Sequence, residues 1–400
     1  MTKRCYLNAV GLICSAGDSP DKLKQSLLNQ QSTLTNTSIY SADQQTVLPI
    51  GIYHGDLPEL SLQDKKWQSR NNQFAMAALN QINDEVQQAI SQFGSHRVGV
   101  IIGTSTAGTA ECETAIEQWV QTGDIPAEYD YGLQEMGAPA QYIANYLGVQ
   151  GPCYGISTAC SSGAKTLASA RRLIRAGVCD AVIVGGVDTL CKLTVHGFSS
   201  LDAVSEDICN PFSANRQGIN IGEAAALFLM TATAKGVELL GVGEDSDAYH
   251  LSAPDPTGAG AIRCMTAALN DGNLTADEID YVNLHGTATK LNDQMESIAM
   301  HSVFGADTFC SSTKPFTGHT LGAAGAIEAA ICFLTVEAAC EGFLPVQIWD
   351  GVADSALPNI NLVSSDTQLT KPVNYVLTNS FAFGGNSISL LLGRVGDNEV

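Results

Sequence analysis

The stretch Gly-Ile-Ser-Thr-Ala-Cys-Ser-Ser-Gly, residues 155–163, lies between an apolar segment and a helical pattern. We expect Cys160 to stand where a strand passes directly into the N-terminus of a helix. The positive end of the helix dipole favours the thiolate, which is the nucleophilic form of cysteine. The alternative is a packing residue, because most free cysteines are buried and behave as small apolar groups. The stretch predicts either a nucleophile or a core position, and the rest of the chain must decide between them.

Around this stretch, short apolar strands alternate with helical patterns, which is typical of α/β architecture. The predicted strands are Arg97–Gly103, Asp180–Gly185, Asp280–Leu284, Tyr375–Thr378 and Ser387–Gly393. Helices are predicted after Cys160 and after His319, and each follows a polar turn that carries a reactive residue. This repetition indicates an internal duplication. We place the two halves at residues 1–240 and 241–400, with the break between residues 232 and 245.

The composition excludes several classes of function. The 400 residues carry 20 Lys and Arg against 41 Asp and Glu, a formal net charge of −21, which disfavours binding to nucleic acid or to anionic lipid. The apolar fraction is 45% and the charged fraction only 15%, which suits tightly packed layers and an oligomer. No apolar run has membrane-spanning length, and the N-terminus lacks the apolar core of a signal peptide. We expect a soluble, cytoplasmic protein without membrane insertion.

The cysteines point to the same compartment. There are twelve, with no Cys-x-x-Cys pair and no Cys/His cluster at zinc spacing. In a protein that is not exported, an even number of cysteines does not imply disulfides. We therefore expect reduced, mostly buried thiols and no metal site.

Three further segments place reactive side chains at the predicted ends of strands or helices. They are Asn-Leu-His-Gly-Thr-Ala-Thr at 283–289, Ser-Ser-Thr-Lys-Pro-Phe-Thr-Gly-His at 311–319 and Phe-Gly-Gly at 383–385. Taken singly, His285 fits a satisfied core histidine, His319 a residue of a first helical turn and Lys314 a solvated lysine. The glycine pair fits a hairpin turn. Together they combine a thiol, two imidazoles and an amine at element ends, where enzymes place reactive groups.

These motifs resemble, in order and over nearly the whole chain, those of the β-ketoacyl-acyl carrier protein synthases of the type I/II branch of the thiolase superfamily. The matching segments are Thr-Ala-Cys-Ser-Ser-Gly at Cys160, His-Gly-Thr-x-Thr at His285, Lys-x-x-x-Gly-His-x-x-Gly-Ala-Ala-Gly from Lys314, Asn-Ser-Phe-x-Phe-Gly-Gly to Gly385, Asn210-Pro211-Phe212, Gly218, Gly222-Glu223 and Asp247–His250. The resemblance implies an α/β, thiolase-like fold, with two duplicated halves in a five-layered α-β-α-β-α core that is usually dimeric.

The resemblance also implies a decarboxylative Claisen condensation. Cys160 would accept an acyl group from the pantetheine thioester of an acyl carrier protein, and malonyl-carrier protein would then lose CO₂ and attack the acyl thioester. The product would be a 3-oxoacyl-carrier protein of fatty acid, polyketide or aryl polyene synthesis. The backbone N–H groups of Cys160 and Phe383 are the family's oxyanion donors, and such donors contribute about 3–4 kcal/mol each. His285 and His319 would hydrogen-bond the malonyl thioester oxygen through Nε2 without supplying a full charge.

Further residues take supporting roles by the same resemblance. Lys314 would organise His319, with Glu328 as its partner, and Thr287 and Thr289 would bond pantetheine or the malonyl carboxylate. Two carboxylates match positions that hold the loop of the first histidine, although a solvated helix start explains them equally well: Asp293 and Glu296.

Phe383 matches the residue that gates the acyl pocket, and Gly384 and Gly385 would let its loop swing so that malonyl enters only after acylation. The family usually reads Gly-Phe-Gly-Gly-Thr-Asn, whereas residues 382–387 read Ala-Phe-Gly-Gly-Asn-Ser here. Loss of the first glycine predicts a stiffer hinge.

Carrier proteins are acidic, as this chain is, so docking needs concentrated positive charge. Lys65, Lys66 and Arg70 lie roughly where relatives carry a docking patch, and a charged helix start is the alternative reading. A second basic cluster, common in relatives, is missing, because no Lys or Arg occurs between Arg97 and Lys165. We expect a homodimer, or a heterodimer in which a homologous subunit supplies the missing charge. The carrier's pantetheine arm would take the place of a bound cofactor.

Other members of the superfamily fit the sequence less well. A non-catalytic chain-length subunit would lack the nucleophile, which Cys160 supplies. A thiolase would use a second cysteine late in the chain, and no cysteine follows Cys340. The coenzyme A-primed initiating synthases use Cys-His-Asn, whereas the third residue here is His319. An elongating condensing enzyme is therefore the leading hypothesis.

Overall fold

The computed structural model describes residues 3–127, 129–338, 342–369 and 371–395 of the chain. The elements of the N-terminal half are β1 (Tyr6–Cys14), α1 (Pro20–Asn29), β2 (Thr35–Thr37), β3 (Leu48–Ile50), α2 (Arg70–Gln81), α3 (Asn83–Phe93), β4 (Val98–Gly103), α4 (Thr109–Thr122), α5 (Ala138–Leu147), β5 (Cys153–Ile156), α6 (Ser162–Arg175), β6 (Ala181–Asp188), α7 (Lys192–Ser199) and β7 (Ala224–Thr231).

The C-terminal half repeats the alternation of strands and helices. Its elements are β8 (Val237–Ser246), α8 (Ala259–Gly272), β9 (Tyr281–Asn283), α9 (Lys290–Phe304), β10 (Phe309–Ser311), α10 (Lys314–Thr317), α11 (Ala324–Glu337), β11 (Asn361–Leu362), β12 (Tyr375–Phe381) and β13 (Asn386–Arg394). The predicted strands and the two predicted helices are all present, with ends that shift by up to three residues.

Strand pairing reveals the duplication. In the N-terminal half, β1, β7 and β6 are antiparallel neighbours, and β4 and then β5 continue in parallel. In the C-terminal half, β8, β13 and β12 are antiparallel neighbours, and β9 and then β10 continue in parallel. The same order and the same directions occur in both halves, and the two sheets join where β1 pairs with β8 at Tyr6 and Leu7.

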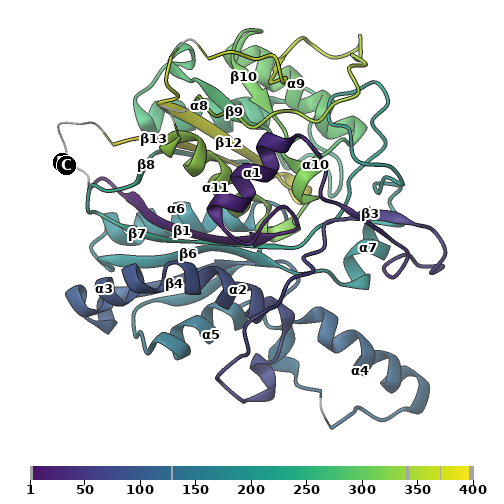
Figure 1. Ribbon diagram of the computed structural model, residues 1–400, viewed down its shortest axis with the longest axis vertical. Coiled ribbons are helices and arrows are strands. Elements are labelled where there is room, and N and C mark those ends of the chain that lie inside the picture. The colour runs from purple at the N-terminus through teal and green to yellow at the C-terminus, as the bar shows by residue number, and fades with distance from the viewer. Residues whose placement is uncertain (1–2, 128, 339–341, 370, 396–400) are drawn as a thin grey trace.

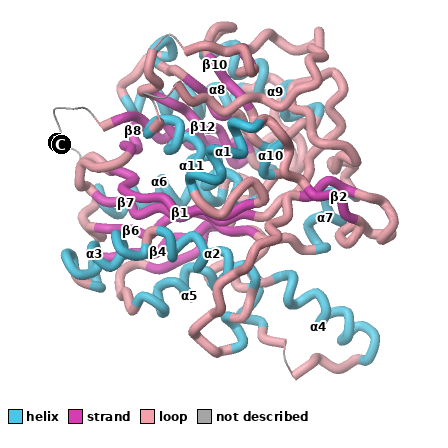
Figure 2. The backbone as a smooth tube through the Cα atoms, viewed as in Figure 1, coloured by secondary structure: helices cyan, strands magenta, loops and turns pink. Residues whose placement is uncertain are grey.

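The layers follow from this arrangement (Figures 1 and 2). Helices α6 and α11 pack against each other between the two sheets, each in contact with strands of both halves. Helices α2 and α5 cover the outer face of the N-terminal sheet, and α8, backed by α9, covers the outer face of the C-terminal sheet. The result is the five-layered α-β-α-β-α core of the thiolase fold.

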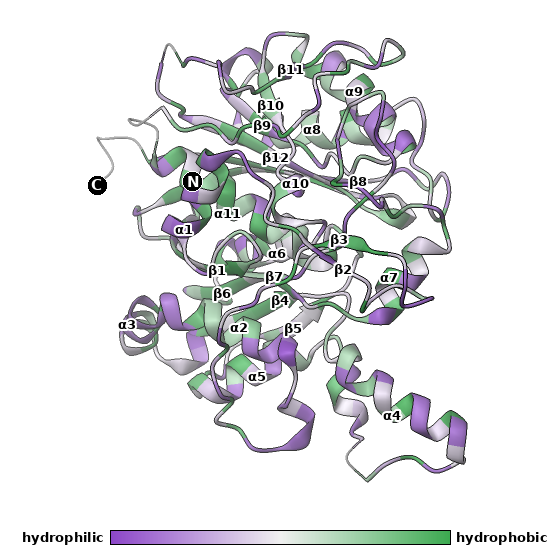
Figure 3. Ribbon diagram, turned by 45° about the vertical axis from the view of Figure 1, so that its right-hand side comes forward, coloured by the Kyte–Doolittle hydropathy of each residue, from purple (hydrophilic) through white to green (hydrophobic). Residues whose placement is uncertain are grey.

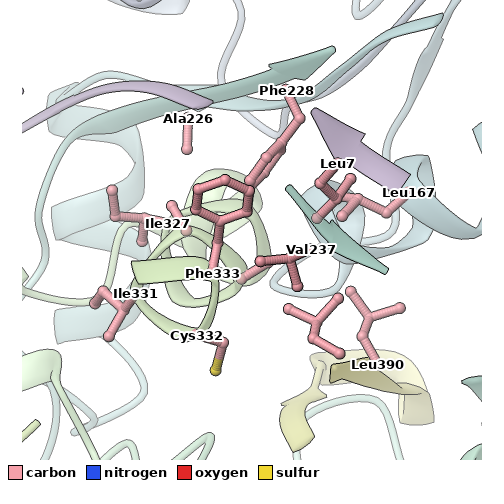
Figure 4. Close-up of a cluster of buried hydrophobic side chains, with 14 of the residues drawn as sticks. Leu7, Leu167, Ala226, Phe228, Val237, Ile327, Ile331, Cys332, Phe333 and Leu390 are labelled. Atoms are coloured by element: carbon pink, nitrogen blue, oxygen red, sulfur yellow. The ribbon is translucent and has the colours of Figure 1, made fainter. Parts of the chain in front are cut away.

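Helix α11 is the centre of the core. Its sequence, Ala-Gly-Ala-Ile-Glu-Ala-Ala-Ile-Cys-Phe-Leu-Thr-Val-Glu, is apolar on all sides, and such a helix must be buried on all sides. Phe333 packs against Phe228 of β7 with ring centroids 6.2 Å apart, and Ile327 and Ile331 lie beside them (Figure 4). Each fully buried side chain of this size contributes about 1.5–3 kcal/mol. Hydrophobic colouring in Figure 3 is concentrated in these inner layers.

The chain passes from the N-terminal sheet to the C-terminal sheet near the predicted break between the halves. β7 ends at Thr231 and β8 begins at Val237, so the turn between them carries the chain from one sheet to the other. The division into residues 1–240 and 241–400 falls inside β8, and as a domain boundary it stays a prediction. In the described part of the chain, no helix is both long enough and apolar enough to cross a membrane.

Candidate active site

Cys160 lies in a sharp turn between β5 and α6. Ala159 has a positive φ of 53°, a left-handed conformation that is strained for a residue with a Cβ. The turn is held from inside by Ser162, whose hydroxyl accepts the N–H of Thr158 at 2.9 Å and donates to the carbonyl of Ala159 at 2.6 Å. The predicted position at the start of a helix is confirmed, and the thiol is 5% exposed.

His319 reaches Cys160 from the other half of the molecule. Its Nε2 lies 3.0 Å from Sγ of Cys160. The backbone of His319 is pinned on both sides, because its N–H donates to the carbonyl of Asn220 at 2.6 Å and its carbonyl accepts the N–H of Gly222 at 3.0 Å. Helix α11 begins five residues later, so its contact with α6 brings the two reactive residues together.

His285 completes the cluster from the end of β9. Its ring centroid lies 5.4 Å from that of His319, with the rings nearly perpendicular at 83°. The carboxylate of Glu296 holds this loop by accepting the N–H of His285 at 2.8 Å and that of Gly286 at 2.7 Å. One ligand atom from each of Cys160, His285 and His319 lies within 4.8 Å of the others, so this cluster is also the place where a metal ion could bind. The absence of a metal stays a prediction.

Lys314 links the loop of His285 to helix α11. Its Nζ is buried and donates both to the carbonyl of His285 and to the carboxylate of Glu328 on α11. The predicted pairing with Glu328 is present. Lys314 acts on His285 through a hydrogen bond and on His319 through its charge alone.

Burial sets the protonation of the imidazoles. It lowers the pKa of His285 and of His319 well below the usual value, and the positive charge of Lys314 lowers both further. Both rings are therefore neutral at physiological pH, as hydrogen-bond donors to a developing enolate must be to avoid supplying a full charge. In the described part of the chain, neither Nδ1 atom has a hydrogen-bond partner, so no contact there fixes the tautomer.

Burial also overturns the expectation of a resting thiolate at Cys160. It raises the pKa of this thiol to about 12, and the charge of Lys314 and the backbone N–H of Phe383 offset only part of the increase. A helix dipole contributes about 0.3–1 kcal/mol at an exposed site, too little to overcome the loss of hydration around a buried sulfur. Cys160 is therefore a neutral thiol at rest, and it needs a base to become a nucleophile.

Three of the buried carboxylates, all near the histidines, have pKa values close to physiological pH. Burial raises the pKa of Asp293 to about 6 and those of Glu296 and Glu328 to about 7. Asp293 is fully buried and accepts the N–H of Phe212 at 2.8 Å and that of Ala288 at 3.2 Å. The reading of Asp293 and Glu296 as a solvated helix start is therefore wrong, since both hold the loop of His285.

A cavity of about 730 Å³ leads to this cluster. Its lining includes Cys160, both histidines, Thr287, Thr289, Phe383, Gly384 and Gly385. Phe383 lies in the turn of the β12–β13 hairpin. The predicted hairpin turn and the predicted gating loop are therefore the same segment. Its ring packs against Phe198 with centroids 5.6 Å apart, and its N–H lowers the pKa of Cys160, as an oxyanion donor beside the sulfur would.

The three residues predicted to dock the carrier protein make different contacts. Lys65 donates to the carbonyl of Ala127 at 3.1 Å, and the Nζ of Lys66 lies 4.7 Å from the ring centroid of Trp67. Arg70 instead binds the fully buried carboxylate of Glu223 and the carbonyl of Tyr53. Arg70 is thus paired with a buried acid, and Lys66 also lies 3.7 Å from the carboxylate of Asp64. Docking through Lys65 and Lys66 stays a prediction.

Sequence reasoning missed Asp188, at the end of β6. Its buried carboxylate accepts the N–H groups of Ser105, Thr106 and Gly322 at 2.6–3.0 Å and the hydroxyl of Thr104 at 2.6 Å. It thereby ties the loop after β4 to the loop after His319. The only signal in the sequence was a lone acid at the end of an otherwise apolar strand.

Comparison with known proteins agrees with this geometry. Residues 9–235 match the family model "Beta-ketoacyl synthase, N-terminal domain", and residues 237–345 match "Beta-ketoacyl synthase, C-terminal domain". The chain is 30% identical to nodulation protein E of Rhizobium meliloti (strain 1021), over 99% of this chain and 100% of that protein. It is also 30% identical to 3-oxoacyl-[acyl-carrier-protein] synthase 2 of Staphylococcus aureus, over 84% and 88% of the two chains.

The similar solved structures are ketosynthases as well. A ketosynthase (ApeO) in complex with its chain length factor (ApeC) from Xenorhabdus doucetiae is 42% identical, with a TM-score of 0.92 over 98% of both chains. The ishigamide ketosynthase/chain length factor is 28% identical, with a TM-score of 0.87 over 99% of this chain and 100% of that one. These relatives agree with the Cys-His-His cluster found at the centre of a duplicated thiolase fold. The chain belongs to the β-ketoacyl synthases, which are the acyltransferases that perform the condensation step of fatty acid and polyketide synthesis.

Proposed function

We propose that this chain is the catalytic subunit of a heterodimeric ketosynthase, in which Cys160 carries the growing acyl group and a homologous subunit without a nucleophile completes the pocket. The observation that carries the catalytic part is the contact of 3.0 Å between Cys160 Sγ and His319 Nε2, with His285 beside them in one cavity.

Acyl transfer begins with a proton transfer. Since the Cys160 thiol is neutral at rest, its proton must leave as the sulfur attacks the acyl thioester, and His319 Nε2 lies within hydrogen-bond reach. The same imidazole then returns the proton to the sulfur of the departing pantetheine. The backbone N–H groups of Cys160 and Phe383 hold the oxygen of the tetrahedral intermediate.

Condensation uses the imidazoles as donors. As malonyl-carrier protein loses CO₂, negative charge develops on its thioester oxygen, and the Nε2–H groups of the neutral imidazoles stabilise it. His319 has to change to its Nε2–H tautomer once Cys160 is acylated, and no hydrogen bond to Nδ1 among the described residues opposes that change. Lys314, paired with Glu328, holds the backbone of His285 in position through its carbonyl. Thr287 and Thr289, whose hydroxyls lie 3.0 Å apart, line the cavity on the route of the pantetheine arm. That arm arrives on the carrier protein, so the proposal includes no bound cofactor and no metal.

Two features of the chain support a partner subunit. Strand β5 is the last strand of its sheet, and its outer edge is open within the described residues. Helix α4 projects from the body and exposes Ile116, Trp119 and Val120 by 42–77% (Figure 1). An open edge and an apolar helix face both favour association. The ketosynthase that is 42% identical was solved with its chain length factor, which favours a heterodimer over a homodimer.

One experiment tests both parts. The purified chain is incubated with acyl-carrier protein and malonyl-carrier protein, alone and with a homologous chain-length-factor subunit, and enzyme and products are followed by mass spectrometry. We expect acylation of Cys160, its loss in Cys160→Ala, and elongation only with the partner. Normal condensation by Cys160→Ala would disprove the mechanism, and full elongation by the chain alone would disprove the heterodimer. The proposed enzyme acts in the cytoplasm.

A further inference from the structure

The charges that line the active-site cavity are unevenly placed. Among the described residues, the lining includes two cations, Arg216 and Lys290. Arg216 is only 7% exposed, and its guanidinium binds the carboxylate of Asp354 at 2.6 Å and the carbonyl of Ser213 at 2.8 Å. Arg216 is therefore already neutralised. Lys290 is exposed, and none of the ion pairs found among the described residues includes it.

Lys290 occupies an unusual position for a lysine. It is the first residue of the 15-residue helix α9, where the helix dipole repels a cation and attracts an anion. The N-cap residue Thr289 makes no side-chain capping hydrogen bond, so the first N–H groups of the helix lack that partner. An anion beside Lys290 would be favoured by the lysine and by the helix terminus together.

The same segment carries the substrate-facing residues. Lys290 follows Thr287 and Thr289 on the loop of His285, and all four residues line the cavity. Five residues of chain span at most about 17 Å, so Lys290 lies within that distance of His285 along the same wall of the cavity. The backbone there is fixed, since Arg216 donates to the carbonyl of Lys290 at 3.4 Å.

The remaining charges restrict where an anion can lie. Three carboxylates also line the cavity: Asp202, Asp247 and Asp255. Asp247 accepts the N–H groups of Tyr249 and of Asp255, both at 3.1 Å, and belongs to the segment between β8 and α8. Asp255 belongs to the same segment and Asp202 follows α7, so these carboxylates repel an anion from elements other than α9, whose first residue is the cation.

We propose that Lys290 binds the phosphodiester of the carrier protein's phosphopantetheine arm. This inference rests on the proposed function, because it assumes that the arm enters this cavity with its thioester at Cys160. Thr287 and Thr289 then contact the middle of the arm, and Lys290 with the α9 terminus holds its charged end. Lys290 is a substrate-binding residue that acts before the chemical step, so it should affect KM far more than kcat.

The test compares two soluble acyl donors that differ only in the phosphate: an acyl-phosphopantetheine and the corresponding acyl-pantetheine. Acylation of Cys160 is followed by intact-protein mass spectrometry for the wild type, Lys290→Gln and Lys290→Arg, with any partner subunit present. Lys192→Gln is the matched control, because Lys192 is also an exposed lysine at the first position of a helix but does not line the cavity.

We expect the wild type to prefer the phosphorylated donor by about tenfold in kcat/KM, as one charge-assisted contact supplies. Lys290→Gln should lose this preference, because its kcat/KM falls about tenfold further with acyl-phosphopantetheine than with acyl-pantetheine, and Lys290→Arg should retain most of it. A preference that survives in Lys290→Gln, or an equal loss with both donors, would overturn the inference. If neither donor acylates the wild type, the proposed function itself fails.

Discussion

At the scale of single residues, the active site depends on burial more than on the helix dipole. Cys160, His285, His319 and Lys314 are each at most 5% exposed. Burial holds the thiol and both imidazoles neutral, so the three reactive groups start uncharged and the charges lie behind them, on Lys314 and the buried carboxylates. Catalysis then requires a proton to move between Cys160 and His319 rather than a thiolate that already exists.

The first residue-scale prediction concerns His319. Replacing it with Ala removes one of the two donors to the enolate and the base beside Cys160. Loss of one such donor typically costs 10²–10³-fold in rate, and we expect a fall of about that size in CO₂ release from malonyl-carrier protein. Release of ¹⁴CO₂ from labelled malonyl-carrier protein measures it, and a rate equal to that of the wild type would remove His319 from decarboxylation.

The second concerns the pH dependence of stability. The pKa of His285 is lowered in the folded state, so below about pH 6.5 the unfolded chain binds a proton that the folded chain does not. The stability that this group contributes is therefore lost as the pH falls, by at most about 1.4 kcal/mol at pH 5.5. Urea unfolding at pH 7.5 and 5.5 should show a smaller acid-induced loss for His285→Asn than for the wild type.

The wild type and His285→Asn must be compared with each other at each pH. The raised pKa values of Asp293 and Glu296 act in the opposite direction over part of the same range and cancel in the difference. Equal acid-induced losses in both proteins would contradict the assignment of a buried neutral imidazole.

At the scale of elements, the crossing of α6 and α11 determines the distance between Cys160 and His319. The helices approach closely through Gly163 on α6 and Gly325 on α11. A Cβ on Gly163 would lie 2.8 Å from the N atom of Ala326 and 3.0 Å from the carbonyl oxygen of Gly322. Both neighbours are backbone atoms, so one helix would have to shift.

Gly163→Ala should therefore lower the free energy of unfolding by about 1–3 kcal/mol and slow the acylation of Cys160. Gly197→Ala in α7 is the control, because a Cβ there meets no atom within 4 Å, and we expect it to gain about 0.5–1 kcal/mol. Urea unfolding of both variants measures these changes. Equal free energies of unfolding for Gly163→Ala and Gly197→Ala would show that the helix crossing tolerates a methyl group.

At the scale of the whole molecule, an acidic enzyme must bind an acidic carrier. The formal charge of −21 makes the long-range interaction repulsive, so local basic groups have to offset it. Lys65 is exposed and Lys66 is partly exposed beside Asp64 in the N-terminal half, whereas Arg70 binds the buried carboxylate of Glu223.

Reversing both charges, in Lys65→Glu/Lys66→Glu, should raise KM for carrier protein by about tenfold with little change in kcat. The same variant should accept a soluble acyl-pantetheine as well as the wild type does, since that donor lacks the carrier surface. Steady-state kinetics with both donors provides the measurement. An unchanged KM for carrier protein would locate docking elsewhere on this chain or on the partner subunit.

The sequence by itself determined which chemical groups the site uses and in which fold they stand. Each reactive residue follows a predicted strand or stands near the start of a predicted helix, and short apolar repeats and glycine turns mark those elements in the sequence. These residues are Cys160, His285, Lys314, His319 and Phe383. The duplication was visible because each half repeats a polar turn before an Ala-rich helix. Such features depend on residue type and short-range spacing, which a linear chain records directly.

Only the tertiary structure decided the distances and the charges. Cys160 and His319 are 159 positions apart, and their contact depends on the packing of α6 against α11. The neutral thiol, the fully buried Asp293 and Glu296, the inward Arg70 and the network of Asp188 all follow from neighbours supplied by distant segments. Desolvation depends on every atom around a group, and sequence spacing does not record it.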